Sequence, residues 1–468
     1  MQSRRNNQEK TICVITKINH ENNHHLNQKN MAILTKQQAQ DILKKVLSYS
    51  KSDSCEVSLR GSDGGNIRYA RNAVSTAGQI STMSLSVSST FGKKTGTASI
   101  NEFDDASLEK VVKRAEELAM LAPENPEFMP LLGPQEFPVT PTFNAKTAAM
   151  TPDTRAEMVG QSLKVIKDAK LEGAGFLENS TTFGSIMNSK GLFAYNTDTD
   201  VSFSVTVRNQ EGTGSGYVNQ SFNDLDKMDT LALSKIAASK ANGSAAAKAI
   251  EPGKYTVILE PLAAADMLSN MFRGFDARSA DEGRSFMSKK GGGTRLGEQL
   301  FSENVNIYSD PMNPDLPSGT WNGDGQLLKK TKWVENGVVK NLAYSRYWAD
   351  KKGVEAVPFG SSFVMEGGTQ SLEELIKGTE KGILVTRFWY IRSVDPQTLL
   401  LTGLTRDGTF YIENGEIKFP VKNFRFNESP VIMLNNVEAL GKPVRSGNII
   451  IPPMKIKDFT FTSLSDAV

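Results

Sequence analysis

The chain has 468 residues, enough for about two to four domains with a sizeable buried core. Its 54 basic and 52 acidic side chains leave a formal net charge of +2. That balance excludes the strongly basic surface of a protein that wraps nucleic acid or binds anionic membranes. No apolar run is long enough to cross a bilayer. We therefore expect neither a nucleic-acid partner nor a membrane.

Histidine and cysteine are scarce, and their positions limit the chemistry further. The three histidines, His20, His24 and His25, all precede residue 31, and the two cysteines are Cys13 and Cys55. The body of the chain therefore forms no Ser-His-Asp triad, no Cys-His pair and no histidine-ligated zinc site. Two cysteines cannot build a disulfide framework, so we expect a reducing compartment.

The predicted elements begin after an unusual N-terminal segment. Residues 1–30 are rich in Asn and basic side chains, and we interpret them as a disordered extension or a false start. Thr35 and Gln38 then form a predicted capping box at the start of a helix. Alternating strands follow, and a second helix begins after Asp104. Residues 31–121 are thus expected to form a first α/β unit.

Residues 122–152 contain seven of the 19 prolines and are interpreted as a linker, because proline interrupts helices and central strands. The order of helix, strand meander, glycine-rich turn and helix recurs in residues 153–248, which predicts a second α/β unit. Residues 249–468 open with a buried strand and a helix, and then read as a β-rich C-terminal domain. The expected fold class is α+β, with two helix-meander-helix units followed by a mainly β domain.

Two glycine-rich segments invite comparison with phosphate-binding loops. Residues 291–297 lack the Gly-Lys-Ser/Thr ending of such a loop and have no clear strand-to-helix context. Residues 212–216 lack the features of a phosphate-binding loop in the same way. We interpret both segments as flexible loops.

The densest group of carboxylates near a predicted helix end is Asp276, Asp281 and Glu282. Carboxylates alone suit Mg²⁺ or Ca²⁺ better than Zn²⁺, so this group is a weak candidate for a cation site. Arg278 and Arg284 alternate with the three carboxylates, which favours an ion-pair network instead.

The segment 405–417 predicts a β-hairpin. Phe410 and Ile412 alternate along one strand, and Asn-Gly at 414–415 tolerates the positive φ angles of a tight turn. Turn chemistry does not explain the charged Arg-Asp pair at 406–407, which we place at the start of the strand. The residues that we consider as candidates for a groove or a structural hairpin are Arg406, Asp407, Gly408, Thr409, Glu413, Asn414 and Gly415.

The same segment carries a family resemblance. Residues 405–417, followed by 421–427, resemble the C-terminal signature of the TldD/PmbA family, which an older name calls modulators of DNA gyrase. Further stretches that are similar to this family are residues 68–74, 296–300, 305–311, 321–325 and 334–338. The resemblance covers about residues 31–468 and is strongest after residue 250.

The resemblance implies a cytoplasmic peptidase system of two homologous subunits that degrades unfolded or extended peptides and trims peptide precursors. The TldD subunit carries His-Glu-x-x-x-His on a helix and binds catalytic zinc, with a cysteine ligand near its C-terminus. The PmbA or TldE subunit lacks this motif. In this chain the corresponding helix, residues 265–273, contains neither His nor Glu, and no cysteine follows Cys55. The chain therefore resembles a PmbA/TldE-type subunit, and no metal ligand of the family transfers to it.

From this resemblance we expect a non-catalytic subunit of a zinc metallopeptidase, with no cofactor of its own and no activity alone. Its expected partners are peptide substrates and a TldD-type subunit that binds the zinc; without that subunit we expect a homodimer. Two alternatives stay open: a stand-alone homodimeric peptide-binding or scaffold protein without peptidase activity, and a carboxylate-metal hydrolase. Arg406 and Asp407 either fix the hairpin through a charge-assisted hydrogen bond or present a charge to a peptide.

Overall fold

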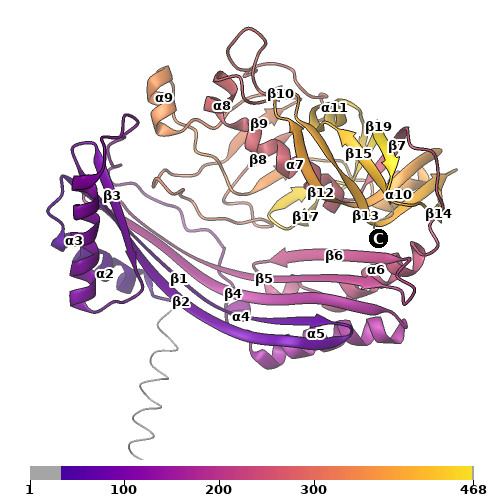
Figure 1. The fold of residues 1–468 in the computed structure, drawn as a ribbon, viewed down its shortest axis with the longest axis horizontal. Coiled ribbons are helices and arrows are strands. Elements are labelled where there is room, and N and C mark those ends of the chain that lie inside the picture. The colour runs from indigo at the N-terminus through magenta and orange to yellow at the C-terminus, as the bar shows by residue number, and fades with distance from the viewer. Residues whose placement is uncertain (1–32, 466–468) are drawn as a thin grey trace, which may run out of the picture. The chain divides into compact units, whose positions relative to one another are not determined.

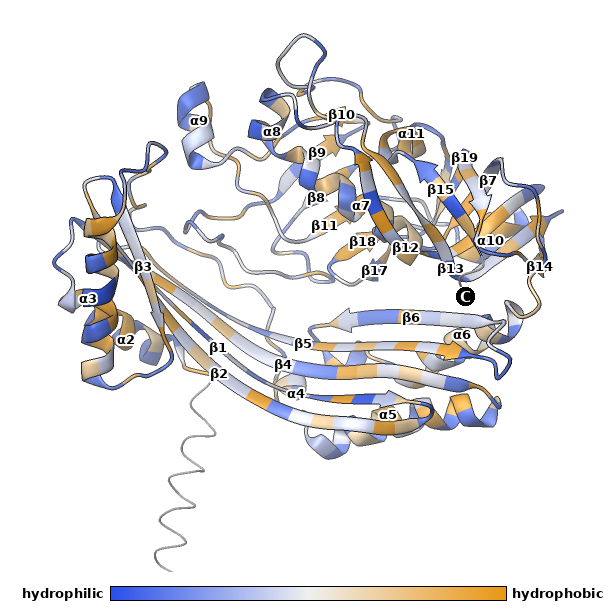
Figure 2. Cartoon of the chain, viewed as in Figure 1, coloured by the Kyte–Doolittle hydropathy of each residue, from blue (hydrophilic) through white to orange (hydrophobic). Residues whose placement is uncertain are grey.

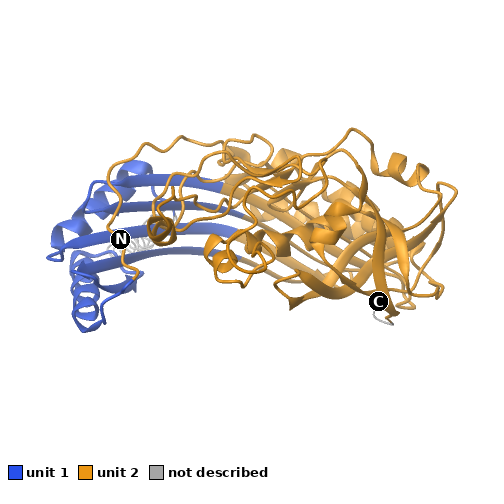
Figure 3. Cartoon of the chain, turned by 90° about the horizontal axis from the view of Figure 1, so that it is seen from above, with its two compact units in different colours: residues 1–64, 79–126, 180–198 blue, residues 65–78, 127–179, 199–468 orange. Residues whose placement is uncertain are grey.

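The computed structural model describes residues 33–465 (Figure 1). Residues 1–30, with all three histidines, lie outside the described residues. The chain forms two compact units (Figure 3). The first takes its residues from the segments up to 64, 79–126 and 180–198, and the second contains 65–78, 127–179 and 199–468. The chain passes between the units several times because four long strands contribute residues to both.

The first helix-meander-helix repeat begins at the predicted capping box. The Thr35 hydroxyl accepts a hydrogen bond from the Gln38 N–H, and the Gln38 side chain accepts one from the Thr35 N–H. Asp104 caps the second helix by accepting a hydrogen bond from the Ser107 N–H. The elements of this repeat are α2 (Lys36–Tyr49), β1 (Ser54–Ala70), β2 (Ala73–Phe91), β3 (Lys94–Ile100) and α3 (Asp105–Leu121).

The second repeat has the same order of elements. Thr151 caps its first helix and Asp229 caps its last. Hydropathy alternates along its middle strand, where Phe203 and Val205 face the core (Figure 2). The elements are α5 (Pro152–Asp168), β4 (Glu172–Asn188), β5 (Phe193–Arg208), β6 (Ser215–Phe222), the 3-10 turn η1 (Leu225–Lys227) and α6 (Thr230–Gly243). The expected recurrence of helix, meander and helix is confirmed.

The two meanders join into one six-stranded sheet with the order β3-β2-β1-β4-β5-β6. The first strands of the two repeats are therefore neighbours, and the third strands lie at the edges. Residues 122–144, in the proline-rich segment, contain no helix or strand, and the short helix α4 (Ala145–Ala148) follows.

Both edge strands approach the last helix of their own repeat through glycine. A Cβ on Gly96 of β3 would lie 2.2 Å from the backbone nitrogen of Ala119 in α3. A Cβ on Gly216 of β6 would lie 2.1 Å from the carbonyl oxygen of Ala237 in α6. The interpretation of residues 212–216 as a flexible loop is therefore wrong for the second half of this segment. Its glycines permit close helix-to-strand packing.

The C-terminal part contains two further sheets. The first has the order β10-β9-β8-β11-β18-β17. Its strands are β8 (Ile307–Ser309), β9 (Thr331–Glu335), β10 (Val338–Val339), β11 (Phe363–Met365), β17 (Val444–Ser446) and β18 (Ile449–Ile451). The helices of this part are α7 (Pro261–Phe272), the 3-10 turn η2 (Arg273–Phe275), α8 (Ala277–Asp281), α9 (Arg346–Lys352), α10 (Leu372–Lys377) and α11 (Pro430–Asn435).

The second sheet closes on itself. Its order is β12-β7-β19-β15-β13-β14, β16 pairs with β19, and β12 also pairs with β13. Its strands are β7 (Lys254–Leu259), β12 (Lys381–Asp395), β13 (Leu400–Glu413), β14 (Glu416–Pro420), β15 (Phe424–Glu428), β16 (Val437–Leu440) and β19 (Met454–Leu464). Helix α7 contacts strands of both sheets and buries Met267, Leu268 and Met271 in their shared core. The α+β class with a β-rich C-terminal part is as expected.

None of the helices in residues 33–465 is both long enough and apolar enough to span a bilayer.

We predict that Gly216→Ala lowers the free energy of unfolding by about 1–3 kcal/mol, because a methyl group has no space against the α6 backbone. Gly96→Ala tests the equivalent contact in the first repeat. Gly78→Ala is the matched control, since no atom lies within 4 Å of a Cβ at that strand position. Urea denaturation measures all three variants, and equal effects for Gly216→Ala and Gly78→Ala would contradict the prediction.

Candidate functional site

A β-bulge in β13 organises the charged residues of the candidate site. Asp407 and Gly408 both lie opposite Thr386 of β12, and their φ angles are +55° and +122°. The paired residues on the two sides of this bulge are Arg387–Arg406 and Val385–Thr409. The Arg-Asp pair thus lies within β13, which begins at Leu400, and not at the start of the strand as the sequence suggested.

The bulge leaves two arginines directly opposite each other, Arg387 on β12 and Arg406 on β13. Like charges at such a position repel each other. Each guanidinium also lies over an aromatic ring, Arg387 at 4.0 Å from the ring centroid of Tyr217 and Arg406 at 3.9 Å from that of Trp389. These rings hold the two planar cations in fixed orientations.

Asp407 provides the nearest negative charge and is only 2% exposed. Its Oδ1 accepts a hydrogen bond of 2.8 Å from the Ser215 hydroxyl, at the start of β6. Its Oδ2 lies 3.4 Å from Arg387 Nη1 and 4.0 Å from Arg406 Nε. The distance to Arg406 is too long for the charge-assisted hydrogen bond that was one expectation for this pair. The main partners of Asp407 are thus Ser215 and Arg387.

Helix α7 contributes a second carboxylate to this region, that of Asp266. Its Oδ2 accepts a hydrogen bond of 3.0 Å from the Phe388 N–H on β12. Burial raises the pKa of Asp266 to about 7, although this hydrogen bond and the charge of Arg387 both favour the ionised form. Asp266 therefore changes its charge near neutral pH beside a cluster of arginines.

A third arginine lies on the neighbouring sheet. Arg208 ends β5 and pairs in register with Ser215, whose hydroxyl holds Asp407. Burial lowers the pKa of Arg406, and the positive charges of Arg208 and Arg387 lower it further, whereas Asp407 raises it. We call Arg208, Arg387 and Arg406 the arginine cluster.

A pocket of about 240 Å³ lies beside the bulge. The bulge contributes Gly408 and Thr409 to its wall, and β6 contributes Ser215. The Thr409 hydroxyl donates to Asn423 Oδ1 at 3.0 Å, so the wall is anchored to the segment that precedes β15. Small hydroxyl and amide groups therefore line the space next to Asp407.

The remaining hairpin residues lie at the other end of β13. Asn414 and Gly415 have φ angles of +54° and +76° and form the expected tight turn, next to the exposed Glu413. The Gly415 N–H donates to the Thr379 carbonyl, and a Cβ on Gly415 would lie 2.6 Å from the Lys377 carbonyl oxygen. The structure therefore separates the predicted set into the bulge residues 406–409 and this turn.

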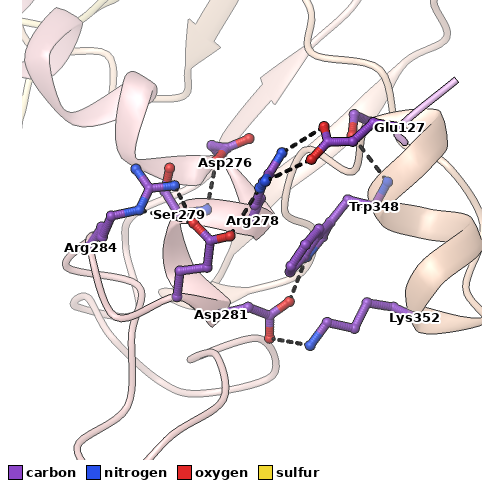
Figure 4. A network of polar contacts seen from close by, with 10 residues as sticks. Glu127, Asp276, Arg278, Ser279, Asp281, Arg284, Trp348 and Lys352 are labelled. Carbon is purple, nitrogen blue, oxygen red and sulfur yellow. Dashed lines mark hydrogen bonds and ion pairs between the residues drawn. The ribbon is translucent and has the colours of Figure 1, made fainter. Parts of the chain in front are cut away.

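The carboxylates near α8 are held by separate partners (Figure 4). Asp276 caps α8 by accepting a hydrogen bond of 2.7 Å from the Ser279 N–H. Asp281 accepts a hydrogen bond of 2.7 Å from Trp348 Nε1 and lies 3.1 Å from Lys352 Nζ. Asp276 thus serves a helix terminus, and Asp281 links α8 to α9.

Glu282 pairs with two arginines, at 3.0 Å from Arg278 and 2.5 Å from Arg284. Arg278 also pairs with Glu127 at 2.9 Å (Figure 4). Within residues 33–465, no group of three or more His, Cys, Asp or Glu side chains is placed to hold a metal ion. The geometry around α8 is that of a balanced ion-pair network.

Sequence reasoning missed several members of the site. Arg208, Ser215 and Tyr217 come from the second repeat, and nothing in a local pattern connects them to β13. Asp266 could have been identified from the sequence, because it is the one charged residue in helix α7, whose other residues are apolar or uncharged.

Comparison with known families agrees with this architecture. Three models of the PmbA/TldA metallopeptidase match in chain order: domain 1 at residues 55–119, the central domain at 146–245 and the C-terminal domain at 252–463. Together they cover well over half of the sequence. The chain belongs to the PmbA/TldD metallopeptidase family.

Individual relatives are distant. A metalloprotease of Methanothermobacter thermautotrophicus is 26% identical over 296 residues, which span 58% of this chain and 62% of the relative. Metalloprotease PmbA of Escherichia coli O157:H7 is 22% identical over 173 residues, 34% of this chain and 37% of the relative.

Solved structures show the same fold. The crystal structure of TldE from Thermococcus kodakarensis superposes with a TM-score of 0.81 at 20% identity, covering 90% of this chain and 99% of that one. A Bacteroides thetaiotaomicron protein described as a modulator of DNA gyrase gives 0.80 at 22% identity, with 92% and 99% covered.

The residues around α7 do not fit the catalytic zinc of a metallopeptidase. The polar side chains of this helix are Asp266, Ser269 and Asn270, and the last two donate hydrogen bonds to carbonyls of their own helix. Imidazole and thiolate groups supply most catalytic zinc ligands, and residues 33–465 contain no histidine and a single cysteine, Cys55 in β1. No reaction step through zinc can therefore be assigned to this chain.

We predict that Asp266→Asn removes part of the pH dependence of stability. The folded-state pKa of about 7 lies above the value of about 3.9 for an unfolded aspartate. The folded protein therefore binds this proton more tightly, and stability falls as pH rises from about 4 through 7. Asn keeps an acceptor for the Phe388 N–H but does not titrate. Relative to wild type, the variant should gain about 2–4 kcal/mol between pH 4.5 and pH 8, measured by urea unfolding. A difference that stays constant with pH would contradict the assignment.

Proposed function

We propose that this chain is the non-catalytic, PmbA/TldE-like subunit of a zinc metallopeptidase that degrades unfolded peptides or matures peptide precursors. The observation that carries the proposal is the composition of α7. In the TldD-type subunit of the family that the sequence resembles, the corresponding helix holds the metal. Here it carries Asp266 and no metal-ligand set.

The surroundings of α7 support a role in holding peptide. Four elements from distant parts of the chain, β6, α7, β12 and β13, bring charged and aromatic side chains together there. Trp389 is 39% exposed and lies beside a partly exposed arginine. Aromatic and arginine side chains are the residues that contribute most at recognition surfaces.

The two alternative functions that the sequence analysis left open require different sets of side chains. A stand-alone peptide-binding protein would use the same side chains without a zinc-bearing partner. A carboxylate-metal hydrolase would need Asp276, Asp281 and Glu282 to converge on one ion, whereas each of them has its own partner. We therefore retain only the first of these alternatives.

We predict that purified residues 31–468 bind no zinc tightly and cleave no peptide alone, because this part of the sequence has one cysteine and no histidine. Metal analysis and a peptidase assay on an unfolded protein substrate measure this. Addition of a TldD-type subunit should produce activity that a chelator abolishes. Stoichiometric zinc with chelator-sensitive cleavage by the pure chain would overturn the proposed function.

The assembly of the chain provides an independent test. Because homologous subunits often share one mode of association, we predict a homodimer alone and a heteromeric complex when a TldD-type subunit is present. Light scattering at micromolar concentration and co-purification measure the two states. A monomer that forms no complex would contradict both. A homodimer that does not bind the TldD-type subunit would favour the stand-alone peptide-binding protein.

A further inference from the structure

We propose that residues 73–82 of strand β2, which we call the free edge of β2, pair with the same residues of a second copy of this chain. The two strands would run antiparallel about a two-fold axis. The proposal rests on the homodimer that the proposed function includes, and it adds the surface through which the two copies associate. It requires neither zinc nor a peptide.

The first argument is that the outer edge of β2 is paired over only part of its length. In the sheet, β2 lies between β1 and β3. The shorter strand β3 pairs with residues 85–91 of β2, beginning with Leu85 opposite Ile100. Among the described residues, no strand pairs with the same edge over residues 73–82. The backbone N–H and C=O groups of this stretch are therefore available to a strand of another chain.

The second argument is that both faces of the same stretch are uncovered. All residues from 73 to 82 are exposed, whereas Leu85 and Val87 further along the strand are buried. Val74 is 53% exposed and Ile80 is 63% exposed. Because side chains of a strand alternate between its faces, these two apolar side chains lie on one face. Exposed apolar side chains beside unpaired backbone groups are typical of a surface that another chain covers.

The third argument is that this edge lacks the features that prevent strand pairing. Free edges of natural sheets are protected by charged side chains, proline, bulges or short length. The strand β14, at the end of the second C-terminal sheet, has five residues, carries Lys418 and ends at Pro420. Residues 73–84 of β2 contain no charged residue and no proline. The edge of β2 is thus suited to pairing, whereas that of β14 is not.

The fourth argument is that the free edge is complementary to itself. When two copies pair about a two-fold axis perpendicular to the sheet, one residue lies opposite its own copy. If that residue is Ala77, Val74 of each copy lies opposite Ile80 of the other, and the other facing pairs are uncharged. The two apolar pairs would have Cβ atoms about 4.5–5.5 Å apart. A shift of the centre by one residue, to Thr76 or Gly78, separates Val74 from Ile80.

The test introduces complementary charges at the two apolar positions. Sedimentation velocity on the full chain measures the dissociation constant of the dimer. Val74→Lys and Ile80→Glu should each raise this constant about tenfold or more, because each change places two charges into the two symmetric apolar pairs. Mixed in equal amounts, the two variants should form a heterodimer with nearly wild-type affinity. In that heterodimer, the introduced ammonium faces the introduced carboxylate, and the second pair remains Val opposite Ile.

Val139→Lys is the matched control for the introduced charge. Val139 is 88% exposed and lies outside every helix and strand, so this variant should dimerise as the wild type does. Urea unfolding of each variant shows whether it folds. If one charged variant does not fold, the comparison of the other with Val139→Lys still decides whether the free edge carries the dimer.

A cysteine at the proposed two-fold axis tests the register independently. In a Cys13→Ser background, Ala77→Cys should form a disulfide between two copies on oxidation, because directly opposite Cα atoms lie about 4.5–5.5 Å apart. Gly78→Cys should cross-link far less, because its two copies would be diagonal neighbours at about 7–8 Å. Cys55 is buried and stays in both variants. Preferential cross-linking of Gly78→Cys would overturn the register centred on Ala77.

The outcomes that overturn the proposal are distinct from failure of the proposed function. A monomeric wild type, or a Val74→Lys dimer as tight as that of Val139→Lys, overturns the pairing of the free edge. Two weakened variants that do not recover on mixing overturn the antiparallel two-fold arrangement. Chelator-sensitive activity with a TldD-type subunit would sustain the proposed function in each of these cases.

Discussion

The cross-strand pair of Arg387 and Arg406 is the constraint on which the site depends. A regular antiparallel ladder would point successive side chains of β13 to opposite faces. The extra residue at 407–408 breaks that alternation, so Arg406 and Asp407 both reach the region of Arg387. In a regular ladder, Asp407 would point to the face opposite that of Arg406. The positive φ angles at 407 and 408 are the conformational cost of this arrangement.

The glycines of β6 connect this constraint to the rest of the fold. Because Gly214 and Gly216 allow the α6 backbone to lie against β6, the residues between and after them have a fixed position. Ser215 then donates to Asp407, and Tyr217 lies under Arg387. The second repeat thus serves as one wall of the charged region.

Much of the fold could be predicted from the sequence because local chemistry determines it. The capping box at Thr35, the cap at Asp104 and the Asn414-Gly415 turn each depend on residues a few positions apart. The recurrence of helix, meander and helix followed from hydrophobic periodicity. Composition placed the boundaries between the predicted units at residues 121 and 152. The compact units of the structure divide instead within long strands, and local sequence patterns cannot show such a division.

The site was less predictable because its partners are distant in sequence. The pair at 406–407 was identified as unexplained by turn chemistry, yet its position inside a bulged strand depends on pairing with β12. Asp407 and Ser215 are 192 positions apart, and no periodicity links them. Glycines 214 and 216 were misinterpreted for the same reason: their need for space arises from a helix that follows later in the chain.

The two charged regions of the C-terminal part differ in how closely their opposite charges are paired. Around α8, Glu282 lies between Arg278 and Arg284, and Glu127 compensates Arg278 again, so that each cation has a carboxylate at 3.0 Å or less. Those side chains are substantially exposed, and exposed pairs of this kind contribute little free energy. The carboxylate of Asp407 lies further from its two arginines, at 3.4 Å from Arg387 and 4.0 Å from Arg406, and these two cations are less exposed. The two cations of the second region are therefore held by the faces of Tyr217 and Trp389 as well as by a carboxylate.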